Sequence, residues 1–168
     1  EYSGGNFYEN MCHQLAFWYE VLALKIPAAA TTIGGVYLWK DGREVPDTMN
    51  VAFEHPEELL LAWDSCFGNN RLGSEEYVLG TDGTLHRSRS VRYLPEKVNN
   101  PDGPELSANT RSQPDGHMVN FFDCIRSGRL PNCPFDVGFN VSIASRMAVE
   151  SYRQKRTVRW DAEKEELV

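Results

Sequence analysis

Successive strand patterns occupy the middle of the chain, after an opening helix pattern and before two further helix patterns and a last strand. Strands that follow one another without intervening helices pair antiparallel, and they must bury one face under the helices. We therefore expect an α+β fold with a mainly antiparallel open sheet covered by helices on one face. The 168 residues, 41% of them hydrophobic, are enough for one core and short for two. A single domain over residues 1–168 is the prediction.

Apolar residues at three- and four-residue spacing define the expected helices. The first helix runs from about Asn6 to Leu24 and is closed by Pro27; the second is ended by Gly128; the third runs from Asp136 to Arg156. Their apolar stripes are Phe7, Met11, Leu15, Trp18 and Leu22; Met118, Phe121, Phe122 and Ile125; and Val137, Val141, Ala144, Ala148 and Tyr152.

Alternating or β-branched runs between Pro27 and the second helix predict strands. The segments are Ala30–Trp39, Thr48–His55, Leu59–Phe67, Tyr77–Gly80, Thr84–His86 and Val91–Leu94, and Thr157–Trp160 forms the last strand. Gly34-Gly35 indicates a bulge or a close backbone approach. Asp82-Gly83 predicts a hairpin turn, because both residues tolerate positive φ. The polar segment Asn99–Asp115, with three prolines, predicts an exposed loop.

A carboxylate and a histidine four residues apart begin the first helix. Glu9 and His13 would share one helix face, so Glu9 could orient the imidazole, which suits general acid/base chemistry near neutral pH. Asn6 and Glu9 also match a capping box, which would give Glu9 a structural role instead. A structural role for His13 is the alternative as well.

The second half of the chain has three parts in a recognisable order: the stretch His117–Pro131, a helix pattern, and the segment Thr157-Val158-Arg159-Trp160. Together with the opening segment, this order resembles the C-terminal domain of the Gfo/Idh/MocA oxidoreductases over nearly the whole chain. In this resemblance Gly4 and Gly5 match two glycines of the family's opening motif, and His13 matches its catalytic histidine. Glu9 stands where an Asp is usual. Ala16 stands where many members carry a second Asp.

The resemblance implies the catalytic and substrate-binding half of an NAD(P)-dependent oxidoreductase acting on a sugar, polyol or sugar derivative. The chain has no Gly-x-Gly, so it lacks the dinucleotide fingerprint, and it lacks the family's Glu-Lys-Pro motif. NAD or NADP would be held mainly by an N-terminal Rossmann domain that is missing here. The chain alone is therefore expected to be inactive.

Polar residues around His13 are the candidate substrate ligands. Tyr8, Asn10 and Gln14 flank the histidine, and Arg43, Asp47 and His117 are further candidates. No metal site is expected, because the four cysteines show no zinc-site spacing.

Two other functions stay open. Relatives of the resembled family use tightly held NAD to hydrolyse glycosides, and the C-terminal half alone does not distinguish that reaction from net dehydrogenation. The fold could also survive as a non-catalytic oligomerisation or binding module, a hypothesis favoured by the departures at Glu9 and Ala16.

The expected partners are a small carbohydrate-like molecule and further copies of the chain. In the resembled family the uncovered sheet face makes subunit contacts, so a homo-oligomer through that face is expected. The net charge of −7 argues against nucleic acid, and no apolar run approaches the roughly 20 residues that span a bilayer. The compartment, cytoplasmic or periplasmic, is left undetermined.

Overall fold

The computed structural model describes residues 4–71, 73–109 and 116–168. The chain divides into two compact units, residues 1–69 with 130–168 and residues 70–129. Both carry antiparallel sheets, so the α+β prediction is confirmed. The strands belong to two separate sheets, one of five strands and one of four.

The first unit is built on the five-stranded sheet, with strand order β3-β2-β1-β8-β9. Its strands are β1 (Ala29–Gly35), β2 (Thr48–His55), β3 (Leu59–Cys66), β8 (Val158–Asp161) and β9 (Glu166–Leu167). Every neighbouring pair is antiparallel. The predicted bounds of β2 are confirmed residue for residue, because its buried residues alternate strictly with its more exposed ones. β9 was not predicted: two residues are too few to show a period.

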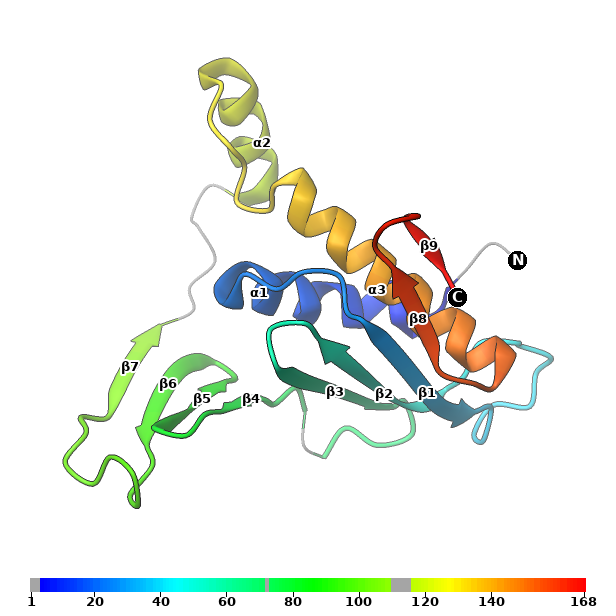
Figure 1. Cartoon of the computed structure of the whole chain (residues 1–168), viewed down its shortest axis with the longest axis horizontal. Coiled ribbons are helices and arrows are strands. Elements are labelled where there is room, and N and C mark those ends of the chain that lie inside the picture. The colour runs from blue at the N-terminus through cyan, green and yellow to red at the C-terminus, as the bar shows by residue number, and fades with distance from the viewer. Residues whose placement is uncertain (1–3, 72, 110–115) are drawn as a thin grey trace. The chain divides into compact units, whose positions relative to one another are not determined.

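Two helices cover one face of this sheet, as predicted (Figure 1). They are α1 (Cys12–Leu22), which continues a π-helical turn η1 (Phe7–Met11), and α3 (Phe135–Gln154). The core lies between these helices and the inner sheet face. Its most deeply buried side chains include Phe7, Met11, Leu15 and Tyr19 from the N-terminal helix, Val51 and Phe53 from β2, and Ala144, Met147 and Ala148 from α3.

The first strand is shorter than predicted. β1 ends at Gly35, whereas its sequence pattern continued to Trp39. The close approach expected at Gly34-Gly35 is confirmed at Gly34, where a Cβ atom would lie 2.5 Å from the carbonyl oxygen of Thr48 on β2. Residues 36–47 instead form a loop, because the backbone N–H groups of residues 37–39 bond to the Asp47 side chain rather than to a neighbouring strand.

The second unit holds the four-stranded sheet, in the order β4-β5-β6-β7. Its elements are β4 (Glu76–Leu79), β5 (Gly83–Arg87), β6 (Ser90–Pro95), β7 (Leu106–Asn109) and the helix α2 (Gly116–Ser127). The β4–β5 hairpin is confirmed, but neither Asp82 nor Gly83 has a positive φ. Gly83 is needed for space, because a Cβ atom there would lie 2.4 Å from the Tyr93 ring. Gly128, at φ +70°, ends α2 as predicted.

The polar segment predicted as a loop contains a strand. β7 pairs with β6 between Ser90–Tyr93 and Leu106–Asn109. All four of its residues are exposed, so an edge strand of this kind carries no hydrophobic alternation that the sequence could show. Residues 110–115 of the predicted loop lie outside the described residues.

A buried histidine lies at the end of β2. The side chain of His55 is fully buried, and neither ring nitrogen has a hydrogen-bond partner among the described residues. The ring meets Tyr19 edge-on at 5.3 Å, and a Glu57 carboxylate oxygen lies 3.8 Å from Nδ1. Burial lowers the pKa of His55 from 6.5, although the charge of Glu57 opposes this shift.

We expect His55 to make folding stability depend on pH below about 6.5. The unfolded chain binds a proton there before the folded chain does, so the stability is fully present above pH 6.5 and falls as pH decreases. Urea unfolding between pH 7.5 and 5 measures this slope. His55→Leu should flatten it, and His117→Gln, at an exposed histidine, should leave it unchanged. An unchanged slope in His55→Leu would contradict the assignment.

Candidate active site

The first helix begins with a π turn that is set by a glycine. Gly5 has φ +60°, and its carbonyl oxygen accepts the N–H groups of Tyr8 (3.0 Å) and Glu9 (3.1 Å). A Cβ atom at Gly5 would lie 2.8 Å from Val45, so only glycine fits against the 36–47 loop. The wider turn brings both Phe7 and Met11 into the core. Such π turns occur frequently at functional sites.

The predicted capping box is wrong. Asn6 is 3% exposed, has helical φ and ψ, and makes no side-chain cap. Its side chain instead donates to the Ser65 hydroxyl of β3 and accepts a hydrogen bond from Asn10. One helical turn later, the indole N–H of Trp63 on β3 donates to Gln14. Asn10 and Gln14 thus belong to a polar seam that joins this side of the helix to β3.

Glu9 and His13 lie on the outer side of the helix, and both are exposed. Within the described part of the chain, His13 makes no hydrogen bond or ion pair. Its imidazole is therefore open to an incoming molecule. Glu9 was predicted to orient His13, but no hydrogen bond joins these two side chains within the described residues.

Tyr8 lies on the side of the helix that faces α3. Burial raises the pKa of its phenol, and the charges of Arg146, Glu150 and Arg153 on α3 act on it as well. A Cβ atom at Gly4 would overlap the Tyr8 ring in its present position. The phenol is 40% exposed and remains accessible beside Glu9.

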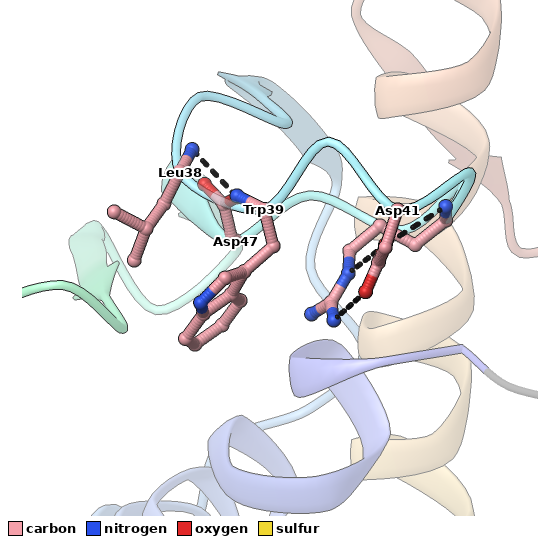
Figure 2. Close-up of polar contacts among 5 residues, drawn as sticks. Leu38, Trp39, Asp41 and Asp47 are labelled. Carbon is pink, nitrogen blue, oxygen red and sulfur yellow. Dashed lines mark hydrogen bonds and ion pairs between the residues drawn. The ribbon is translucent and has the colours of Figure 1, made fainter.

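Asp47 organises the loop between β1 and β2. It is 1% exposed, and its carboxylate accepts the N–H groups of Tyr37 (3.0 Å), Leu38 (2.9 Å) and Trp39 (3.0 Å). Figure 2 shows the Leu38 and Trp39 nitrogens directed at this carboxylate. Burial alone would raise the pKa of Asp47, but these N–H groups and the Thr48 hydroxyl lower it to about 2.

Arg43 lies on the same loop as Asp47. Its guanidinium pairs with Asp41 through two hydrogen bonds, of 2.8 and 2.5 Å, and lies 4.6 Å from the centre of the Trp39 ring. The Asp41 partner raises the pKa of Arg43. The loop contacts the start of η1 through Val45 and Gly5, which brings Arg43 and Asp47 into the neighbourhood of the helix start.

The other predicted site residue lies in the second unit. His117 is exposed at the start of α2. Tyr37 and Trp39 have high β-propensity and were predicted to lie in a strand, but the structure places both in the 36–47 loop. Among the described residues, no three His, Cys, Asp or Glu side chains gather as metal ligands. None of the helices in this part of the chain combines the length and apolar composition of a membrane span.

Solved structures of oxidoreductases share this fold. The aldose-aldose oxidoreductase from Caulobacter crescentus, complexed with glycerol, matches with a TM-score of 0.66 and 19% identity over 88% of this chain and 45% of its own. An oxidoreductase from Agrobacterium radiobacter in complex with NAD+, L-tartaric acid and magnesium matches with a TM-score of 0.65 and 16% identity, over 90% of this chain and 48% of its own. An NAD-binding protein from Listeria innocua matches with a TM-score of 0.66 and 16% identity, over 92% of this chain and 47% of its own.

The chain thus spans about half the length of each of these three proteins. No protein-family model and no curated protein sequence matches it. At identities below 20%, the likeness shows the fold.

We expect Asp47→Asn to loosen the 36–47 loop. The amide presents a donor where the carboxylate accepts N–H groups, so at least one of the three loop hydrogen bonds is lost. The melting temperature at pH 7 should fall, and trypsin should cut faster after Lys40 and Arg43. Because the folded pKa of Asp47 is depressed, its contribution is present above about pH 4 and is lost as the pH falls towards 2.

Asp41→Asn is the matched control, since it changes a carboxylate of the same loop that is exposed. An exposed ion pair contributes little to stability, so this variant should melt like the wild type. Equal trypsin resistance of Asp47→Asn and the wild type would contradict the anchoring role.

Proposed function

We propose that this chain is the C-terminal, substrate-binding and catalytic half of an NAD(P)-dependent oxidoreductase of the Gfo/Idh/MocA type, acting on a sugar, polyol or sugar derivative. The observation that carries the proposal is the position of His13. It is exposed on a helix whose start is fixed by Gly5 and by the seam to β3. The fold shared with oxidoreductases of twice the length supports it.

The proposed chemistry of this half is proton transfer. A carbinol carbon that loses a hydride must also lose its hydroxyl proton, and the neutral imidazole of His13 accepts that proton. Glu9, on the same outer face, stabilises the imidazolium that forms. Tyr8 and Asn10 border this face and supply hydrogen-bonding groups for substrate hydroxyls.

The described residues do not fit a dinucleotide pyrophosphate. The chain contains no Gly-x-Gly, and its helix start at Gly5 is filled by Val45 rather than open to a phosphate. In this proposal a nicotinamide, the hydride acceptor, is held by another part of the full-length protein. We assign no step of its binding to this chain.

The substrate class is supported by the chemistry of a similar protein and by the site itself. The Caulobacter enzyme is an aldose-aldose oxidoreductase. Tyr8 and Asn10 of this chain are exposed and uncharged, which suits the binding of hydroxyl groups.

His13→Asn in the full-length enzyme should keep the fold and lose most of the turnover. Loss of a positioned acid/base lowers kcat about 100- to 10,000-fold. Glu9→Gln should have a smaller effect on kcat, and Glu20→Gln, exposed two turns further along α1 than His13, should have none. Initial rates across pH and melting temperatures measure both effects. Near wild-type turnover by His13→Asn across the pH range would reject the acid/base role of His13.

We also propose a homo-oligomer through the outer face of the five-stranded sheet. Two large apolar side chains of this face are exposed: Ile33 (71%) and Leu60 (70%). Between them Thr31, Ala52 and Ala62 form a row of small side chains across three strands. A flat surface of this kind lets a second sheet pack closely.

Ile33→Glu should therefore shift the chain towards monomers. The substitution places a charge in the proposed contact, and Ile33 makes no core contact that the fold requires, given its exposure. Light scattering at tens of micromolar, with Tyr77→Glu on the second sheet as the control, measures the effect. A wild-type chain that is monomeric at this concentration would refute the oligomer.

A further inference from the structure

Four large side chains of the first unit are exposed, three on the 36–47 loop and one just after β3. Their exposed fractions are 65% for Tyr37, 48% for Leu38, 38% for Trp39 and 44% for Phe67. Trp39 and Phe67 are in contact, with ring centres 5.6 Å apart and planes at 42°. Leu38 packs near Gly68, next to Phe67. Apolar groups gathered in this way mark binding surfaces rather than random exposure. We call Leu38, Trp39 and Phe67 the aromatic corner.

One buried residue holds the aromatic corner in place. The Asp47 carboxylate accepts the N–H groups of Leu38 and Trp39, and the Asp47 carbonyl oxygen accepts the N–H of Phe67 at 3.0 Å. Asp47 thus positions the rings of both Trp39 and Phe67, although Trp39 lies between β1 and β2 and Phe67 follows β3. A surface that is already ordered loses little conformational entropy when a ligand binds.

The charge beside the aromatic corner is balanced. Arg43 lies over Trp39, but Asp41 takes two of its donors, Nε and Nη2. Its third nitrogen, Nη1, makes no hydrogen bond within the described residues. The corner therefore offers apolar rings beside a hydrogen-bond donor without net positive charge. This arrangement favours a neutral ligand with hydroxyl groups over an anionic one, since an anion would compete with Asp41.

The corner adjoins the start of the first helix. Val45 of the loop contacts Gly5, and Figure 2 shows the loop above the N-terminal helix, with Trp39 extending from the loop. Tyr37 and Asp47 also lie close enough to Tyr152 on α3 to affect its pKa, which burial chiefly raises. The loop therefore contacts the start of the helix that carries the candidate site and also lies near α3.

We propose that the aromatic corner is a binding subsite for a neutral sugar ring. The C–H face of a pyranose packs against Trp39 and Phe67, and Arg43 Nη1 donates to a ring hydroxyl. This inference rests on the proposed function in one respect: the sugar is taken to be the substrate, or part of the substrate, on which His13 acts. Binding at the corner itself requires neither nucleotide nor turnover.

Saturation-transfer NMR on residues 1–168 with D-glucose as the probe tests the subsite. Saturation should reach the ring C–H protons of glucose. Trp39→Ala should weaken binding at least tenfold, whereas Trp39→Phe, which keeps an aromatic ring, should retain most of it. Tyr77→Ala, which removes an exposed aromatic residue of the second unit, is the matched control and should bind like the wild type.

Three results would overturn the subsite: no transfer to glucose, equal binding by Trp39→Ala and the wild type, or tighter binding of D-gluconate than of glucose. Loss of self-association in Trp39→Ala without an effect on glucose would instead assign the corner to protein contacts. The proposed function is tested separately by His13→Asn turnover. Glucose binding with no effect of His13→Asn on turnover would retain the subsite and reject the catalytic role.

Discussion

The buried carboxylate of Asp47 is the interaction on which the arrangement of the first unit's site depends. It accepts three consecutive N–H groups from residues 37–39, and the backbone of Asp47 bonds to Gly35 and Phe67. These bonds end β1, start β2 and fix the segment after β3. A buried charge is tolerated only when its hydrogen bonds are satisfied, so the loop conformation and the burial of Asp47 require each other.

The same loop constrains the helix that carries the candidate active site. Val45 leaves room only for glycine at position 5, and the positive φ of Gly5 opens the π turn. From there the helix divides into sides with different partners: the core, β3, α3 and solvent. In the polar seam, the side chains of Asn6 and Gln14 form hydrogen bonds with β3, so they have a structural role. His13 is left on the solvent side, where a substrate can reach it.

The proposed oxidoreductase function has two separate kinds of support. One is the fold shared with oxidoreductases, and the other is an accessible histidine in the candidate site. The fold likeness covers about half of each matched chain, at identities of 16–19%. The function proposed for this chain therefore depends on its own residues: His13 for proton transfer and the aromatic corner for sugar binding. Both lie in the first unit and are linked through the contact between Val45 and Gly5.

The sequence by itself determined the elements with a clear short-range period. The alternation of Met49, Val51 and Phe53 and the helical stripe through Met11 and Leu15 reflect burial of one face, and burial repeats at the period of the backbone. It also located Glu9 and His13 on one helix face. The tertiary structure alone decided that β1 ends at Gly35 and that the strands form two sheets. It also decided that Gln14 bonds to Trp63. These features depend on hydrogen bonds and contacts between residues that are distant along the chain, which no local pattern records.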